Sequence, residues 1–282
     1  MTTDAGHGTS GTVPVFDSAH SASPFREELR ELWQYRDLTR QWAARNITLR
    51  YKRSVLGVLW TLIEPLMLTI ILTVVFSTAF RFPMVNFPIY LLSGLLLFDF
   101  FNRSTMQIVE EVVASGNLAQ RIHVPRSAFA LASMFAYLFN WLVALVPLVA
   151  IVIILRHPLT PAAMLVPVGI LLTALFCLGV GLMVATISVF FHDFKLAFQV
   201  VLTAWFYATP IIYPIEIVPE RVRGLLGFNP LFHLIRLVRD PVYEGVVPSP
   251  SVWLYAAATS VVTALLGWWV FTRWRDAFDY RV

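Results

Sequence analysis

Charged residues and cysteines are both scarce in this chain of 282 residues. Only 13% of the residues are charged, whereas a soluble domain carries about 25%. A soluble protein of this length would need a more highly charged surface. Cys177 is the single cysteine, which excludes an intramolecular disulfide and any zinc or iron–sulfur site built on cysteine.

The sequence also lacks the short motifs of several enzyme classes. It contains no G-x-x-x-x-G-K-[ST] loop, and neither Lys52 nor Lys195 follows a glycine, so a Walker A site for ATP is excluded. H-E-x-x-H, G-x-S-x-G and D-x-D are absent as well. We therefore expect no catalytic residue, no metal site and no cofactor in this chain. If energy drives its activity, a second protein must bind the ATP and its Mg²⁺.

Six long apolar runs fill most of the chain. A helix needs about 20 mostly apolar residues to cross about 30 Å of hydrocarbon. The runs cover residues 57–80, 88–109, 129–155, 162–191, 196–213 and 252–274. They predict an all-α integral membrane protein with six transmembrane helices, in a domain that spans residues 54–282.

Basic residues gather on one side of the predicted membrane. Residues 1–23 have no apolar core and predict a disordered tail. With six spans, fourteen of the 21 basic residues fall on the side of both termini and six on the other. Because Lys and Arg are enriched in cytoplasmic loops, both termini are predicted to lie in the cytoplasm, at the plasma membrane. The pI of 9.4 follows from this topology and does not indicate a nucleic-acid partner.

Residues 24–53 predict an amphipathic interface helix that ends in a basic rim. Trp33 and Trp42 lie on two different apolar faces, which predicts a bend near Arg36. Tryptophan and arginine on such a helix suit the boundary between water and lipid, although a helix packed on a cytoplasmic partner would show the same pattern. The rim residues, which either anchor the first span or bind a diphosphate, are Arg50, Tyr51, Lys52 and Arg53.

Three ionisable residues lie within the first two runs. Glu64 precedes Pro65, which kinks a helix, and an acid at that depth should face protein or water. Asp99 and Arg103 are four residues apart, so they share one helix face and are predicted to form an intramembrane ion pair. The interiors of the third to sixth runs contain no acid, which argues against a proton relay.

Two connections between the runs predict short helices. Residues 115–127, on the inner side, have room for a helix that ends at Pro125, and the alternative is a plain surface turn. On the outer side, residues 214–247 predict one helix over 219–226. A second helix there begins at Asn229-Pro230, with Asn as N-cap, and ends at Pro241. Arg236 and Arg239 are predicted to face away from the apolar side of that second helix.

Aromatic residues are concentrated in the second and fifth runs. Aromatic belts at membrane interfaces and ordinary core packing both explain such residues. The sharper hypothesis is an aromatic translocation path, because ring faces can contact the C–H faces of sugars. The candidates for this path are Phe98, Phe101, Trp205, Tyr207 and Tyr213.

Five segments, in order over residues 30–275, resemble the type-2 ABC exporter permeases for polysaccharides. His192 and Asp99 depart from that family's pattern, which often has an arginine and an aromatic residue there. The five matching segments are residues 50–60 with Glu64-Pro65-Leu66; Ser93-Gly94-Leu95 with Phe98, Phe100 and Phe101; Gly116-Asn117 with Arg121 and Val124-Pro125; Phe191-His192-Asp193-Phe194 with residues 209–214; and Phe228-Asn229-Pro230-Leu231 with Arg239 and Gly245.

The resemblance implies a homodimer of six-span subunits paired with two copies of a cytoplasmic ABC ATPase, which binds the ATP and Mg²⁺. It implies that a lipid-diphosphate-linked glycan of the O-antigen, teichoic acid, capsule or cell-wall galactan type is exported through a bacterial inner membrane. The basic rim would bind the diphosphate. Coupling to the ATPase would use Asn117, Arg121, His123 and Arg126, and an outer gate would use Asn229, Pro230, Arg236 and Arg239.

Two alternatives belong to other functional classes. An integral-membrane glycosyltransferase would need catalytic acids on its loops and would turn over a sugar donor alone. An ATP-independent channel or carrier would show ion currents or uptake in vesicles that contain this chain alone.

Overall fold

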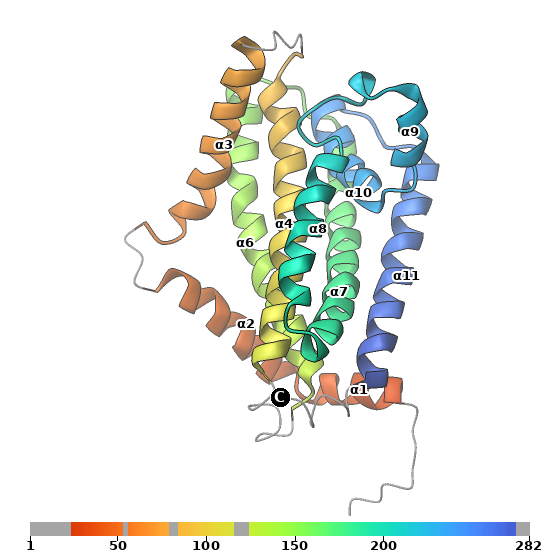
Figure 1. The fold of residues 1–282 in the computed structure, drawn as a ribbon. Coiled ribbons are helices and arrows are strands. Elements are labelled where there is room, and N and C mark those ends of the chain that lie inside the picture. The colour runs from red at the N-terminus through yellow and green to blue at the C-terminus, as the bar shows by residue number, and fades with distance from the viewer. Residues whose placement is uncertain (1–23, 53–55, 79–83, 116–123, 275–282) are drawn as a thin grey trace, which may run out of the picture.

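The computed structural model describes residues 24–52, 56–78, 84–115 and 124–274, and this part of the chain is helical without a strand. The long apolar runs form α3, α4, α6, α7, α8 and α11, which stand side by side in an upright bundle (Figure 1). The helices are α1 (Pro24–Gln34), α2 (Arg36–Tyr51), α3 (Leu59–Thr78), α4 (Phe87–Ala114), α6 (Arg126–Ile154), η1 (Pro161–Leu165), α7 (Val166–Phe190), α8 (Phe194–Ala208), η2 (Ile215–Ile217), α9 (Glu220–Leu226), α10 (Pro230–Arg239), η3 (Asp240–Glu244) and α11 (Pro250–Trp274).

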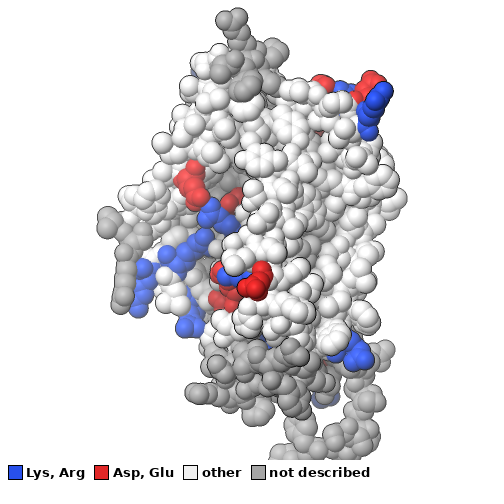
Figure 2. Space-filling view, viewed as in Figure 1, with Lys and Arg blue, Asp and Glu red and all other residues white. Residues whose placement is uncertain are grey.

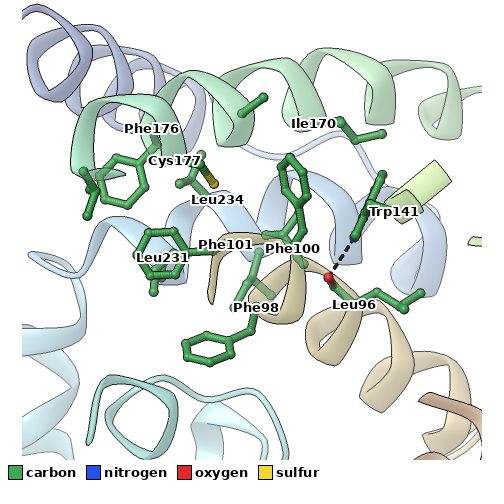
Figure 3. Packing of buried hydrophobic residues seen from close by; sticks show 14 of the residues in the cluster. Leu96, Phe98, Phe100, Phe101, Trp141, Ile170, Phe176, Cys177, Leu231 and Leu234 are labelled. Carbon is green, nitrogen blue, oxygen red and sulfur yellow. Dashed lines mark hydrogen bonds between the residues drawn. The ribbon is translucent and has the colours of Figure 1, made fainter. Parts of the chain in front are cut away.

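Helix α4 is the centre of the bundle and packs against α3, α6, α7, α8 and α10. Its Phe100 and Phe101 are almost fully buried. Phe101 lies 5.5 Å from Phe176 of α7, and Trp141 of α6 donates a hydrogen bond of 2.7 Å to the carbonyl of Leu96 (Figure 3). Interdigitated aromatic rings and one satisfied indole N–H therefore connect three neighbouring helices.

Helices α7 and α11 approach each other at the level of their backbones. A Cβ placed on Gly179 would lie 2.4 Å from the carbonyl oxygen of Thr263, and one on Gly267 would lie 2.2 Å from that of Gly179. Any side chain larger than hydrogen would push the two helices apart. Small residues at such a contact are the usual means by which membrane helices gain van der Waals contact, since lipid supplies no hydrophobic force between them.

Helix α1 lies across one end of the bundle, which we call the α1 end, and α2 rises obliquely from that end (Figure 1). The break between them falls at Tyr35, one residue before the predicted bend. Trp42 and Asn46 of α2 donate hydrogen bonds of 3.4 and 3.2 Å to the Glu111 carboxylate of α4. Trp33 is 73% exposed, so α1 and α2 are fixed to the bundle while part of their aromatic surface stays open.

Four helical segments of the described chain are long and apolar enough to cross a membrane: Leu59–Thr78, Arg126–Ile154, Pro161–Phe190 and Pro250–Trp274. Helix α4 is long enough, but it carries Asp99 and Arg103. The fifth predicted run forms only the 15-residue α8. It ends at Ala208, five residues before the predicted end, because Pro210 disfavours a helical conformation at Thr209. The membrane-integral, all-helical architecture stands, whereas a count of six spans remains a prediction.

The segment between α8 and α11 contains the two short helices α9 and α10 at the end opposite α1 (Figure 1). Asn229 caps α10, since its side-chain oxygen accepts a hydrogen bond of 3.1 Å from the Leu231 amide. The α-helix ends at Arg239, two residues before Pro241, in agreement with the predicted end. The chain continues from Asp240 through one π-helical turn, and Gly245, with φ of 70°, ends it.

Candidate functional site

A cavity of about 750 Å³ opens on one side of the bundle, between the end of α2 and helices α3, α4, α6 and α8. Most of this face of the molecule is uncharged, but acidic and basic side chains gather in a hollow (Figure 2). The polar side chains that line the cavity are Arg50, Tyr51, Thr61, Glu64, Asp99, Asn102, Arg103, Asn140, Gln199 and Thr203. These residues lie up to 153 positions apart in the sequence, from Arg50 to Thr203, and the fold brings them to one surface.

Arg103 is the centre of the charged wall. Its Nε lies 2.6 Å from Asp99 Oδ1, which is the ion pair predicted from their spacing. Its Nη2 also forms a salt bridge with Glu64 of α3. This second contact joins two helices, whereas the pair with Asp99 lies within α4. The three side chains are each at least one-third exposed, so they face the open cavity rather than the core.

The candidate diphosphate residues are only partly brought together. Arg50 and Tyr51 line the cavity, Lys52 is exposed and does not line it, and Arg53 lies outside the described residues. The Arg50 guanidinium carbon is 4.5 Å from the centre of the Tyr137 ring. Tyr51 donates a hydrogen bond of 2.6 Å to Asn140 Oδ1. The end of α2 is thus fixed against α6 with a guanidinium group directed toward the cavity.

Only two of the five aromatic path candidates line the cavity. Phe98 and Tyr207 line the cavity. Phe101 is fully buried, and Trp205 packs against it at 5.4 Å while donating a hydrogen bond of 2.9 Å to Asn229 Oδ1. Tyr213 donates to the Tyr207 carbonyl at 2.8 Å. Trp205 and Phe101 therefore pack in the protein interior, away from the cavity surface.

The candidate coupling residues Asn117, Arg121 and His123 lie outside the described residues. Arg126 is described, and it is the buried first residue of α6. The role of these residues in contact with an ATPase stays a prediction.

The outer segment is held to the bundle by Arg239, which is buried, although the sequence predicted that it faces away from the apolar side. Its guanidinium donates hydrogen bonds of 2.8 Å to the carbonyls of Pro210 and of Ile211, and lies 3.8 Å from the centre of the Tyr90 ring. A Cβ on Gly94 would fall 2.0 Å from Arg239 Nη2. The missing side chain at Gly94 is what makes room for the arginine.

Arg236 and Asn229 occupy the same segment with different partners. Arg236 forms an ion pair of 3.0 Å with Asp240. Burial raises the pKa of the Asp240 carboxyl to about 6, although the nearby Arg236 guanidinium opposes that shift. Burial also lowers the pKa of His233.

Asn229 accepts from Trp205 and donates to Thr209 Oγ1 at 2.9 Å, so it joins α10 to the end of α8, next to its neighbour Pro230.

Sequence reasoning missed several members of the cavity. Glu64 was singled out for its depth but not as the partner of Arg103. Asn140, a lone amide in an apolar helix, was a usable signal, because a polar group within a span needs a hydrogen-bond partner. The same signal was available at Asn102 and Gln199, which lie within the second and fifth apolar runs, whereas Tyr137 carries no such signal. Within the described residues, no group of three or more His, Cys, Asp and Glu side chains could hold a metal ion.

Comparison with known proteins gives one family and several relatives. The family described as "ABC-2 type transporter" matches residues 38–243. The O-antigen export system permease protein RfbA of Myxococcus xanthus is 28% identical over 252 residues, which cover 89% of this chain and 97% of that protein. RfbA of Klebsiella pneumoniae is 24% identical over 83% of this chain and 90% of its own length. The polysialic acid transport protein KpsM of Escherichia coli is 26% identical over 79% and 88%.

Proposed function

The chain belongs to the ABC-2 type transporter family, and on that premise we propose that it is the permease subunit of a polysaccharide exporter in a bacterial inner membrane. The relatives that export O-antigen and polysialic acid support this function. The chain is a transport subunit and not an enzyme, and the ATP is hydrolysed by a separate ABC ATPase.

The substrate class that fits the cavity is a glycan linked to a lipid diphosphate. The observation that carries this proposal is the meeting of Arg50 with amide, hydroxyl and aromatic side chains in one cavity of about 750 Å³. A guanidinium offers paired donors to a phosphate. Asn102, Asn140 and Gln199 can exchange hydrogen bonds with sugar hydroxyls, and the rings of Phe98 and Tyr207 can contact the apolar faces of sugars.

A second copy of the chain completes the passage in this proposal. Helix α3 forms one wall of the cavity, and only 6% of its most apolar stretch is buried within the chain. A second subunit packed on α3 would cover part of this apolar surface and close the cavity on its open side. Both termini would lie in the cytoplasm, residues 115–127 would contact the ATPase, and residues 214–247 would form the outer gate.

The test is to replace Arg50 and Lys52 by Gln and reconstitute the permease with its ATPase in proteoliposomes. We expect the concentration of lipid-linked glycan that half-maximally stimulates ATP hydrolysis to rise about tenfold, because each variant position removes a charge-assisted hydrogen bond to phosphate. Hydrolysis without glycan should be unchanged.

The matched control is Arg45→Gln. Arg45 is an exposed arginine on the same helix, 4.4 Å from the Trp42 ring, and it does not line the cavity. Its replacement should leave stimulation by glycan as in the unmodified chain. An unchanged response of the Arg50 and Lys52 double variant would remove these residues from the substrate site.

A further inference from the structure

A second, smaller cavity of about 300 Å³ lies between α2 and α6, and none of its lining residues belongs to the larger cavity. Its apolar members come from α1, α2 and α6, and two arginines and one threonine of α2 complete it. The lining residues are Leu32, Ala43, Leu131 and Phe135, with Arg36, Arg40 and Thr39. An apolar groove with cations at its edge matches the two parts of an anionic lipid: an acyl chain and a phosphate.

The length of α6 places this groove at a membrane boundary. Its 29 residues extend about 43 Å at 1.5 Å per residue, which exceeds the hydrocarbon thickness of about 30 Å. If the excess is shared between both ends, about 6 or 7 Å of α6 lies beyond the hydrocarbon at each end. Leu131 comes five residues, or about 7.5 Å, after the start of α6. Leu131 then lies where headgroups meet acyl chains, and Phe135 lies one turn deeper.

An exposed apolar face of α6 begins at the groove. Phe135, Phe139, Leu142 and Val146 are 50%, 47%, 50% and 55% exposed. Their spacing of four, three and four residues puts them on one side of the helix. An acyl chain that begins in the groove can therefore continue along this face into the hydrocarbon.

The two arginines have free donors for a phosphate. They are four residues apart on α2 and share one face. Arg36 uses one N–H for the carbonyl of Trp33 at 3.2 Å, which leaves four of its five donors. Within the described residues, neither Arg36 nor Arg40 forms an ion pair. Asp37 is adjacent in sequence but does not line the groove.

We propose that this groove binds an anionic glycerophospholipid from the leaflet that meets the α1 end of the bundle. Arg36 and Arg40 hold its phosphate, and one acyl chain lies against Leu131 and Phe135. The bound lipid fixes α2 on α6 and hence the position of Arg50 at the end of α2. The site is separate from the glycan cavity, so it does not depend on the proposed function.

The experiment measures lipid binding to the purified full-length chain by native mass spectrometry, with phosphatidylglycerol and phosphatidylcholine as probes. Phosphatidylglycerol should bind more tightly. The variant Arg36→Gln with Arg40→Gln should weaken that binding about tenfold, because it removes the charge-assisted contacts to phosphate. The control Arg45→Gln removes the same charge from the same helix away from the groove, and should leave the affinity unchanged.

A second variant tests the acyl chain. Leu131→Trp fills the groove without a change in charge and should also weaken phosphatidylglycerol binding. Equal affinity for the two lipids would overturn the proposal. So would an equal loss on replacing Arg45, which would indicate diffuse surface attraction. Displacement of phosphatidylglycerol by a polyprenyl diphosphate at a lower concentration would assign the groove to the glycan carrier instead of a phospholipid.

Discussion

Helices α3 and α7 are almost equally apolar, yet the chain uses them in opposite ways. Their most apolar stretches have mean hydropathies of 2.1 for α3 and 2.5 for the segment that contains α7, but 6% of the first and 67% of the second are buried. Helix α7 packs against α4, α6, α8, α10 and α11, whereas α3 contacts only α4 and α6 to a comparable degree. The apolar character of a segment therefore indicates that it avoids water. It does not indicate whether the segment contacts lipid or protein.

The difference also explains where the cavity lies. Neighbouring helices cover most of α7, and no residue of α7 lines the cavity. Helix α3 leans on its neighbours along one side, and the cavity lies against that side with Glu64 in its wall. The substrate passage is thus expected beside the helix that the chain itself holds least firmly.

The largest expected effect comes from a large-to-small change on α7. Phe176→Ala should lower the free energy of unfolding by about 3 kcal/mol, the low end of the range for such changes. The low end applies because lipid tails solvate an exposed ring as well as the protein interior does, so mainly van der Waals contacts are lost. Phe176 contacts Phe101 and Trp205. The measurement is equilibrium unfolding of the purified chain in mixed micelles.

The control for this variant is Val74→Ala on α3, whose side chain is 54% exposed. It should change the free energy of unfolding by less than about 0.5 kcal/mol. Similar losses at Phe176 and Val74 would contradict the contrast between the two helices.

The next effect in size concerns the contact between α7 and α11. Gly267→Leu should destabilise the chain by about 2 kcal/mol, because the new side chain would meet the Gly179 carbonyl and force the helices apart. Gly224→Ala on α9 is the control, since no atom lies within 4 Å of its Cβ position. That change should be neutral or stabilise the chain by about 0.5 kcal/mol through helix propensity. Thermal unfolding of both variants, compared with the unmodified chain, gives the sign of each effect.

The sequence predicts much of the fold because the length of an apolar run and the residues that begin or end a helix depend only on neighbouring positions in the chain. Asn229 caps α10 as predicted, whereas Pro210 lies inside the predicted fifth run and ends α8 at Ala208, earlier than predicted. The orientation of Arg239 was predicted wrongly. A helical period shows which residues share a face, but it does not show that Gly94 on another helix leaves space for a guanidinium group.

The candidate site was predicted in part for the same reason. Asp99 and Arg103 are four residues apart on one helix, so their pairing follows from local geometry. The bond between Arg103 and Glu64 joins residues 39 positions apart and depends on how α3 lies against α4. The same limitation applies to Arg50 and Asn140, which the packing of α2 on α6 brings to one cavity.

The smallest effect on stability is expected at the ion pair that joins α3 to α4. Glu64→Gln should cost less than about 1 kcal/mol, because both side chains of the pair are more than one-third exposed. Its effect on motion should be clearer. Spin labels on cysteines placed at Val75 of α3 and Leu142 of α6, with Cys177 replaced by Ala, should show a broader distance distribution in the Gln variant.

Asp99→Asn separates the two roles of Arg103. This variant removes the pair within α4 but leaves the bond between Arg103 and Glu64, so α3 should stay as well held as in the unmodified chain. If both variants broaden the distribution equally, the charge balance of the cavity governs α3 and the single bond does not. If Glu64→Gln leaves the distribution unchanged, α3 is held by its packing on α4 and α6. In that case α3 is little buried only because it faces lipid or a second subunit. It would then lack the mobility that a movable cavity wall requires.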